Sequence, residues 1–480
     1  MKPTPPMLSG PPVVGNLFEF MKDHTHLIRR GYDTLGPIFA IKLLNQPVAF
    51  LIGPEYQQTF FMETDKKLSM HKSYAYLKAA LGEVGFTAPP EVYFAQRPIL
   101  LKPFKSERMV KYLQIMQLEV QQWLDSLGEQ GELELRDNIT RIVQNVAAHA
   151  LMGKDFRDRI GPEFWKLYLI LGKAIDPALP PNLPLPKFIR RDRAKKKLRE
   201  MIWPLIAERR AHPEQYDDFL LDFATSQYKD GSPMDDEAIV ALIMGLMFAG
   251  HETTVGQAAW TIIQLLQAPE YLSMVQQELA ENLAPAQPIN ARVLSSLKHV
   301  FWGVEETTRM YPSADILARR AEEDIEIGDY RIPKDWNVMV SPGLAQKLAP
   351  LFSEPEKYDP LRFAPGREED RKHRFAIIGF GGGTHKCAGM NFANNEMMII
   401  TALLLQQFDL ELVTKNPQVD HSMGAGRPEK TIVRYRRKTP GAVSLADHST
   451  VVGEGACPHI ASTATAEVCP APEASSKSSS

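Results

Sequence analysis

The chain contains 480 residues, of which 44% are hydrophobic, and its formal net charge is −3. This composition can bury a large core, and the charge balance gives no general attraction to nucleic acid. Three cysteines in the whole chain argue against a disulfide framework and fit a reducing compartment. The N-terminus lacks the apolar run of a signal peptide, and the longest apolar stretch, Ile239 to Gly250, is too short to span a bilayer. We therefore expect a soluble, cytoplasmic protein without a transmembrane anchor, at most peripheral to a membrane.

Apolar spacing and turn residues predict mostly helices, with short strands between them. A proline-rich entry segment, residues 1–15, leads to a β-hairpin in which Ile38 to Lys42 and Val48 to Ile52 flank Asn45-Gln46-Pro47. The later elements follow in chain order: helices over 107–127 and 138–152, an irregular proline-rich stretch at 177–186, a basic, solvated helix start at 190–197, helices over 235–266 and 291–310, and short strands over 324–340. From residue 440 to 480 the composition changes to Ala, Ser, Thr, Pro and Glu, which predicts a disordered tail.

A glycine-rich turn near the C-terminus carries the only cysteine of the first 456 residues. It reads Phe380-Gly381-Gly382-Gly383-Thr384-His385-Lys386-Cys387-Ala388-Gly389 and precedes a predicted helix from Met390 to Leu405. The free N–H groups and the dipole of a helix N-terminus stabilise a thiolate, so we expect a low pKa for Cys387. The glycines allow the backbone to approach a flat group closely. These features predict an axial thiolate ligand for haem iron, and the alternative is a buried cysteine beside a turn.

This turn resembles the cysteine-ligand loop of the cytochrome P450 superfamily, F-x-x-G-x-[RH]-x-C-x-G, at every fixed position, Phe380 included. The resemblance implies one large, mainly α (α+β) haem-thiolate fold with small β-sheets over residues 16–439. It implies haem b (iron protoporphyrin IX) as the cofactor and Cys387 as its metal ligand. It also implies a mono-oxygenase, an oxidoreductase that inserts one oxygen atom from O2 into a lipophilic substrate. The chain contains no flavin or ferredoxin segment, so electrons would come from a separate ferredoxin or flavoprotein reductase. We expect a monomer.

A second motif lies in the long predicted helix and reads Ala249-Gly250-His251-Glu252-Thr253-Thr254. It resembles the superfamily's [AG]-G-x-[DE]-T-[TS] segment, which crosses the distal face of the haem. Cleavage of the O–O bond requires protons, and an acid–alcohol pair can deliver them. The resemblance therefore implies catalytic roles for Glu252 and Thr253, and the alternative is a buried helix with a polar stripe.

Charged residues elsewhere match supporting positions of the same family. Glu306-Thr307-Thr308-Arg309 is an E-x-x-R motif whose two charges share one helix face. In the family this pair holds the Cys loop together with a later arginine, here Arg362. The resemblance assigns His385 and Arg319 to the haem propionates. Arg97 is a further candidate through Tyr93-x-x-x-Arg97, which is similar to the family's W-x-x-x-R, and Lys102 is a rival for that role.

Several segments resemble the sterol 14α-demethylase branch of the family. Tyr74 to Gly82 is similar to that branch's Y-x-[FY]-x4-[FL]-G loop, in which the first tyrosine bonds a haem propionate; packing tyrosines are the alternative. Apolar residues flank the motifs and predict a lipid-lined pocket: Met244, Met247, Phe248, Ile316 and Leu317. Two positions depart from the branch, since Glu252 stands where the sterol enzymes carry His and Asp315 where they carry an apolar residue. A carboxylate there would need a partner or would point to solvent.

Other functions compete with sterol demethylation. The enzyme could oxidise a fatty acid or terpenoid, or rearrange a peroxide without outside electrons, although Glu252 and Thr253 favour dioxygen activation. A non-catalytic haem-binding or haem-sensing protein is the alternative from another class, because Cys457-Pro458 and Cys469-Pro470 resemble haem-regulatory motifs. The sequence does not identify the substrate, the position oxidised or the redox partner.

Overall fold

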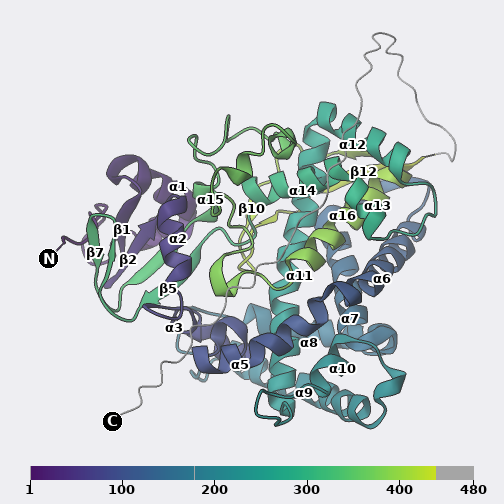
Figure 1. Cartoon of the computed structure of the whole chain (residues 1–480), viewed down its shortest axis with the longest axis horizontal. Coiled ribbons are helices and arrows are strands. Elements are labelled where there is room, and N and C mark those ends of the chain that lie inside the picture. The colour runs from purple at the N-terminus through teal and green to yellow at the C-terminus, as the bar shows by residue number, and fades with distance from the viewer. Residues whose placement is uncertain (1, 178, 439–480) are drawn as a thin grey trace, which may run out of the picture. The chain divides into compact units, whose positions relative to one another are not determined.

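The computed structural model describes residues 2–177 and 179–438 (Figure 1). The predicted tail over 440–480, with its two Cys-Pro pairs, lies outside the described residues. The described part of the chain forms one compact unit, in which a small sheet lies beside a larger group of helices (Figure 1). The prediction of a mainly helical fold with small sheets is confirmed.

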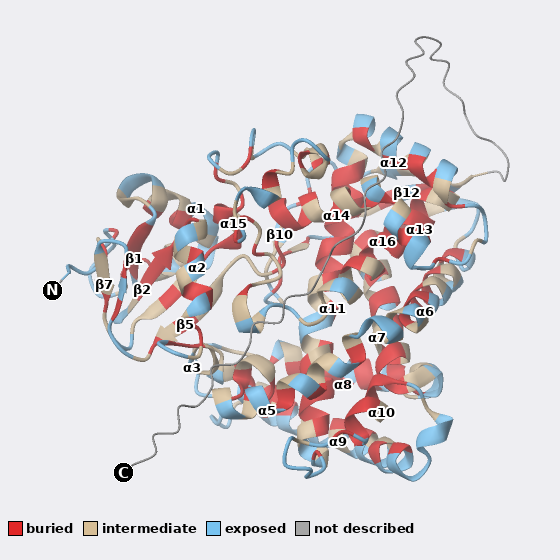
Figure 2. Ribbon diagram, viewed as in Figure 1, coloured by how far each residue is buried: buried red, intermediate tan, exposed pale blue. Residues whose placement is uncertain are grey.

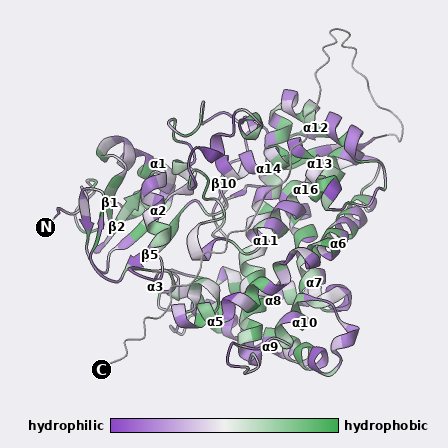
Figure 3. Ribbon diagram, in the orientation of Figure 1, coloured by the Kyte–Doolittle hydropathy of each residue, from purple (hydrophilic) through white to green (hydrophobic). Residues whose placement is uncertain are grey.

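The central helix is α11 (Asp236–Gln267), which packs against α7 (Leu135–Arg159), α14 (Lys298–Met310) and α16 (Met390–Gln407). Its N-terminus is capped by the Asp235 side chain, which accepts from the Ala238 N–H at 2.8 Å. Figures 2 and 3 show that these helices are largely buried and apolar where they meet. α11 extends well beyond the apolar stretch recognised in the sequence, and it is long and apolar enough to cross a membrane. However, 61% of its most apolar window is buried inside the protein, as in a core helix.

The largest sheet has five strands in the order β1-β2-β8-β5-β3. β1 (Ile38–Leu43) and β2 (Gln46–Leu51) form the predicted antiparallel hairpin, in which Ile38 pairs with Leu51. β2 pairs in parallel with β8 (Asn337–Val340), and β5 (Leu317–Ala321) joins β8 to β3 (Leu68–Ser69). The remaining strands form three small sheets: β4 (Gln130–Glu134) with β12 (Ile432–Arg437) and β9 (Phe408–Leu412), β6 (Ile325–Ile327) with β7 (Tyr330–Ile332), and β10 (Val419–Asp420) with β11 (Arg427–Pro428).

The other helices surround this core. They are α1 (Leu17–Leu35), α2 (Pro54–Met62), α3 (Met70–Ser73), α4 (Lys78–Leu81), α5 (Pro90–Leu101), α6 (Ser106–Asp125), α8 (Gly161–Lys173), α9 (Pro186–Ala211), α10 (Phe219–Ala224), α12 (Pro269–Asn282), α13 (Ala291–Ser296) and α15 (Pro342–Ala345). The helix predicted over 291–310 is two helices, because Leu297 has a non-helical backbone (φ −83°, ψ 67°). The basic segment 190–197 lies inside α9 rather than at its start, and it is not wholly solvated, since Arg191 is buried.

Candidate functional site

A cavity of about 370 Å³ lies between α11 and the Cys387 loop. Ala249, Gly250 and Thr253 of α11 line one wall, and Phe380 and Cys387 line another. Of the five apolar residues predicted to flank the motifs, Met247 and Leu317 line this cavity, whereas Met244, Phe248 and Ile316 do not. Two motifs that are about 130 residues apart in the sequence therefore face the same space.

The backbone of the Cys387 loop is held by its glycines and by one internal hydrogen bond. Gly381 and Gly383 have left-handed backbones (φ +71° and +64°), which other residues adopt only at a cost. A Cβ on Gly383 would lie 2.8 Å from the carbonyl oxygen of Phe61. The Cys387 N–H donates to the Phe380 carbonyl at 2.9 Å, and α16 begins three residues after the cysteine. The loop thus fixes the cysteine at the cavity wall just before a helix N-terminus.

The environment of the Cys387 thiol differs from the sequence prediction. The side chain opens into the cavity, yet the dense protein around it raises the pKa of the thiol by burial; a hydrogen bond from the Gly389 backbone and the charge of Lys386 oppose this effect only in part. The predicted low pKa is therefore wrong for the protein alone. A bound metal cation deprotonates a coordinating thiol outright, so the thiolate would form upon coordination.

Arg319 offers the clearest test of whether the cavity suits haem. This arginine is buried and lines the cavity, where Nε donates to Thr64 Oγ1 at 3.0 Å and Nη1 to the Ala318 carbonyl at 2.8 Å. Among the described residues no carboxylate lies within ion-pair distance of it, and burial lowers its pKa. An unpaired buried cation is costly, so the site favours an anionic partner inside the cavity. A haem propionate supplies such a charge, and the donor set fits the cofactor.

His385 already has a partner in the protein. Its Nε2 lies 2.5 Å from Asp65 Oδ2, and its ring stacks on Tyr93 with 4.1 Å between ring centroids. Tyr93 donates its hydroxyl to the Thr384 carbonyl at 2.9 Å, and Arg97 Nε donates to the same oxygen at 3.2 Å. His385 and Tyr93 line the cavity, whereas Arg97 does not. Arg97 therefore stabilises the backbone of the Cys387 loop through its hydrogen bond to Thr384.

The rival Lys102 and the predicted loop residue Tyr74 occupy different positions. Lys102 lies 3.9 Å from Asp222 and is not part of the cavity wall. The Tyr74 hydroxyl accepts a hydrogen bond from the Ala318 N–H at 3.2 Å, which places it beside Arg319. Its ring meets Phe86, a cavity residue, edge to face at 5.8 Å. Tyr74 thus supports the cavity wall without lining it.

The Thr253 hydroxyl donates to the Ala249 carbonyl at 2.6 Å. The hydroxyl proton is therefore engaged in the helix, and Thr253 is one of the residues that line the cavity. The Thr253 carbonyl accepts from Ser313 Oγ at 3.0 Å, which joins α11 to the loop before β5. With its own proton donated, Oγ1 keeps lone pairs that can accept a hydrogen bond from a proton-bearing group.

Glu252 does not line the cavity, unlike its neighbours on both sides in the sequence. Arg427 of β11 donates to its Oε2 at 2.5 Å, and His251 Nδ1 lies 3.3 Å from its Oε1. Burial pushes the pKa of Glu252 up, but His251 and Arg427 outweigh this effect and hold the pKa below its usual value. His251 is buried, lines the cavity and makes no well-aligned hydrogen bond through either ring nitrogen. A proton path through Glu252 would therefore involve His251 and the ion pair with Arg427.

The E-x-x-R motif forms a fully buried ion-pair group. Arg309 donates to both carboxylate oxygens of Glu306, at 2.7 and 2.8 Å, and Arg362 Nε donates to Glu306 Oε1 at 3.0 Å. The predicted contact with Arg362 is confirmed. Gln346 connects this group to the chain before the Cys loop, because its amide donates to the Arg309 carbonyl and its Oε1 accepts from the Ile378 N–H.

Asp315 has a partner in the protein, which was one of the two alternatives expected from the sequence. It does not line the cavity but pairs with His24 of α1, and His421 approaches from the other side. Burial raises the pKa of Asp315, but the hydrogen bond with His24 and the charges of both histidines outweigh it and leave the pKa below its usual value.

Glu396 of α16 lines the cavity and was not recognised in the sequence. Its Oε1 is buried without a hydrogen-bond partner in the described structure, and burial raises the pKa of its carboxyl to about 8. His251 and Arg427 were also missed. His251 could have been suspected from its place inside the distal motif, but no local signal marks Arg427 or Glu396.

Glu396→Gln should remove a pH dependence of stability. The native carboxyl, with a pKa of about 8, keeps a proton that the unfolded chain has lost. Stability therefore falls as the pH rises from about 4.5 towards 8, by about 1.4 kcal/mol per unit, and this loss should be absent in the amide variant. Thermal unfolding at about pH 6 and pH 7.5 tests this expectation, with the exposed Glu281→Gln of α12 as the control. The same midpoint difference between wild type and Glu396→Gln at both pH values would contradict it.

Comparisons with known proteins identify similar sequences and structures. A family model described as "Cytochrome P450" matches residues 5–433. The "Sterol 14-demethylase" of Arabidopsis thaliana is 32% identical over 449 residues, which cover 91% of this chain and 92% of that protein. The "Sterol 14alpha-demethylase" of Mycolicibacterium vanbaalenii is 31% identical over 452 residues, covering 91% and 99%. Among solved structures, "Retinoic acid bound cyanobacterial CYP120A1" matches with a TM-score of 0.81 and 25% identity, over 91% of this chain and all of that one.

Proposed function

The chain belongs to the cytochrome P450 family, whose members are haem-thiolate mono-oxygenases, and we propose that it removes the 14α-methyl group of a sterol. The likeness to sterol 14-demethylases from a plant and a bacterium, over about nine tenths of the chain, carries this proposal. The apolar wall of the cavity supports it. Burying hydrocarbon surface contributes a binding free energy of about 25 cal/mol per Å², so a ligand with a large hydrocarbon surface, such as a rigid multi-ring lipid, is favoured. Three successive oxidations would remove one methyl group as formate.

The haem-binding and loop residues described above have separate roles in this proposal. Haem bound through Cys387 supplies the activation of dioxygen, with electrons from a separate donor protein. Arg319 holds a propionate, while Tyr93, His385 and Arg97 keep the Cys loop in place. Tyr74 positions the strand that carries Arg319. Phe380 holds the cysteine backbone through its carbonyl.

Proton delivery is assigned to the α11 motif. Thr253 lines the cavity, and its hydroxyl oxygen would accept a hydrogen bond from a proton-bearing group there and so orient that group. His251 contacts Glu252 and also lines the cavity, so it can pass a proton from this acid to the cavity. Opening of the Glu252–Arg427 ion pair would give the acid access to new protons. Acid–base groups of this kind contribute about 10²–10⁴ in rate.

Titration with 14α-methyl sterols tests the proposal. Binding should convert the haem from low to high spin, and reconstituted turnover should release formate and the 14-demethylated sterol. A sterol without the 14α-methyl group is the matched control, since it should bind but yield no formate. Spin conversion without formate would exclude demethylation. No reductant-dependent turnover with any ligand would favour a haem-binding protein.

A retinoid or another terpenoid acid is the second candidate substrate. The specific observation is the structural likeness, over nine tenths of the chain, to a protein solved with retinoic acid bound. In the same titration this class should shift the spin state where 14α-methyl sterols do not. That outcome would move the protein out of the sterol branch and leave the mono-oxygenase assignment intact.

A further inference from the structure

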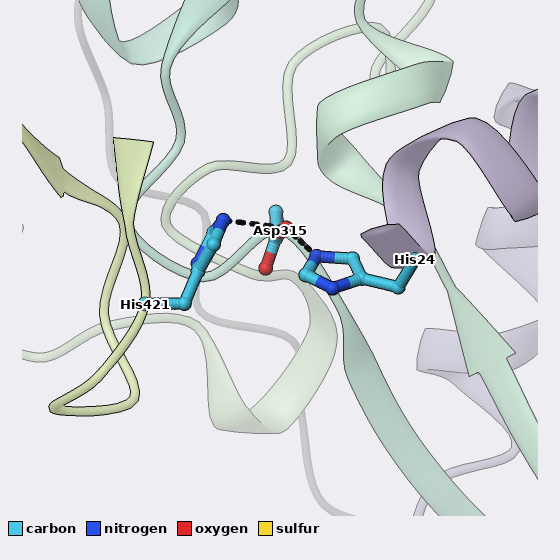
Figure 4. A group of neighbouring side chains, drawn as sticks. All are labelled: His24, Asp315 and His421. Atoms are coloured by element: carbon cyan, nitrogen blue, oxygen red, sulfur yellow. Dashed lines mark hydrogen bonds and ion pairs between the residues drawn. The ribbon is translucent and has the colours of Figure 1, made fainter. Parts of the chain in front are cut away.

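Two histidines and one aspartate meet outside the haem cavity, as Figure 4 shows. His24 comes from α1, Asp315 from the loop between α14 and β5, and His421 directly follows β10. In Figure 4 the Asp315 carboxylate lies between the two imidazole rings, which approach it from opposite sides. Three segments that are far apart in the sequence thus each contribute one metal-binding side chain.

The geometry is close to that of a metal site. His24 Nε2 contacts Asp315 Oδ2, and His421 Nε2 lies 3.7 Å from the same oxygen. The ring centroids are 4.9 Å apart with an interplanar angle of 68°, and the three ligand atoms lie within 4.8 Å of one another. Bonds of 2.0–2.1 Å in a tetrahedral zinc site place neighbouring donors about 3.3 Å apart. To reach that spacing the His24 and Asp315 ligand atoms would have to separate and His421 would have to move closer to Asp315, through side-chain rotations.

The surroundings suit a cation with an open coordination position. The side chains of His24 and Asp315 are each 20% exposed and that of His421 is 35% exposed, so water can reach the group. Among the described residues, no lysine or arginine forms an ion pair with Asp315, so a metal ion would compete for this carboxylate with the protons of the two histidines and with no lysine or arginine. We propose that His24, Asp315 and His421 bind one Zn²⁺, with water as the fourth ligand. Imidazole nitrogen favours Zn²⁺ over Mg²⁺ or Ca²⁺, which prefer oxygen ligands.

Such a site would cross-link three segments of the chain beside the cavity. Ser313 and Ala314, immediately before Asp315, line the cavity, and Ser313 also binds the Thr253 carbonyl. His421 lies in the β10–β11 hairpin, whose Arg427 pairs with Glu252. Zn²⁺ would therefore tie α1 and this hairpin to the loop that forms part of the cavity wall. Because it would bind the folded state, it should also raise the unfolding temperature.

The test uses tag-free, haem-loaded protein in which Cys457 and Cys469 are replaced by serine, because those thiols could bind Zn²⁺ themselves. After equilibrium dialysis against Zn²⁺, we expect one Zn²⁺ per haem iron by elemental analysis, with an affinity measured by calorimetry. His24→Ala, His421→Ala and Asp315→Asn should each weaken that affinity at least tenfold and abolish the zinc-dependent rise in unfolding temperature. His26→Ala is the matched control, since this exposed histidine lies on the same helix two residues away.

Normal carbon monoxide spectra and circular dichroism would show that each variant is folded, and His24→Asn and His421→Asn replace any alanine variant that is not. An excess of Ca²⁺ should not displace the bound Zn²⁺. Equal zinc content in the wild type and all three ligand variants would overturn the proposal. Failure of the wild type to bind Zn²⁺ at micromolar concentration would overturn it as well.

Discussion

Replacing Cys387 with histidine should abolish mono-oxygenase turnover and the far-red Soret band of the reduced, carbon monoxide-treated protein. The reason is that this band and the activation of dioxygen both depend on the electron density of a thiolate ligand. Cys387 is the only cysteine among the described residues, and its side chain opens into the cavity. No other described thiol can replace it. The difference spectrum and product formation are measured on the same preparation.

Control measurements show whether Cys387→His loses the band because the haem ligand is gone or because the protein is unfolded. Cys457→Ser and Cys469→Ser should both keep the band and the activity, since neither belongs to the ligand loop. Circular dichroism should show that Cys387→His keeps its helices, because the loop backbone is held by glycines and by the Phe380 carbonyl rather than by the thiol. A folded Cys387→His variant that retained the far-red band would disprove the assignment.

The parts of the site that the sequence predicted are those whose chemistry is local. The Cys387 loop needs glycines at left-handed positions and a following helix, and both are visible within about twenty residues of sequence. The hairpin of β1 and β2 likewise follows from alternating apolar residues around a turn. Arg362 could be matched to Glu306 because the family pattern places a second arginine after the E-x-x-R motif, and the structure shows this contact.

The parts that the sequence could not predict depend on long-range contacts. Glu252 was expected to be an acid that delivers protons together with Thr253, but no local signal indicated that Arg427, 175 residues later in the chain, forms an ion pair with it. His385 was expected to face a propionate and does line the cavity, but no local signal marked Asp65 as the partner of its Nε2. Neither Arg427 nor Asp65 belongs to a recognisable motif, so the sequence alone does not distinguish them from other arginines and aspartates of the chain. The pKa of Cys387 was predicted from the helix N-terminus alone, whereas burial has the larger effect.

Thr253→Ala should uncouple electron consumption from product formation. Thr253 lines the cavity and donates its hydroxyl proton to Ala249, so in the proposed mechanism its oxygen accepts a hydrogen bond from a proton donor in the cavity. Loss of one positioned acid–base group typically costs about 10²–10⁴ in rate, and we expect product formation to fall within that range. Reductant should still be consumed, and hydrogen peroxide should be released in place of product. The measurement is the ratio of product to reductant under single-substrate turnover.

Two variants decide whether the Thr253 effect is chemical or structural. Thr253→Ser keeps a hydroxyl that can donate to the Ala249 carbonyl, so it should restore most of the coupling. Thr254→Ala removes the neighbouring hydroxyl, which also belongs to the cavity wall but is not assigned a role in proton delivery, and coupling should stay near that of the wild type. If Thr253→Ala were merely to loosen α11, both alanine variants would show similar losses and the serine variant would offer no rescue. Unchanged coupling in Thr253→Ala would instead leave His251 and Glu252 as the proton-delivering groups, because they would then reach the cavity without the hydroxyl.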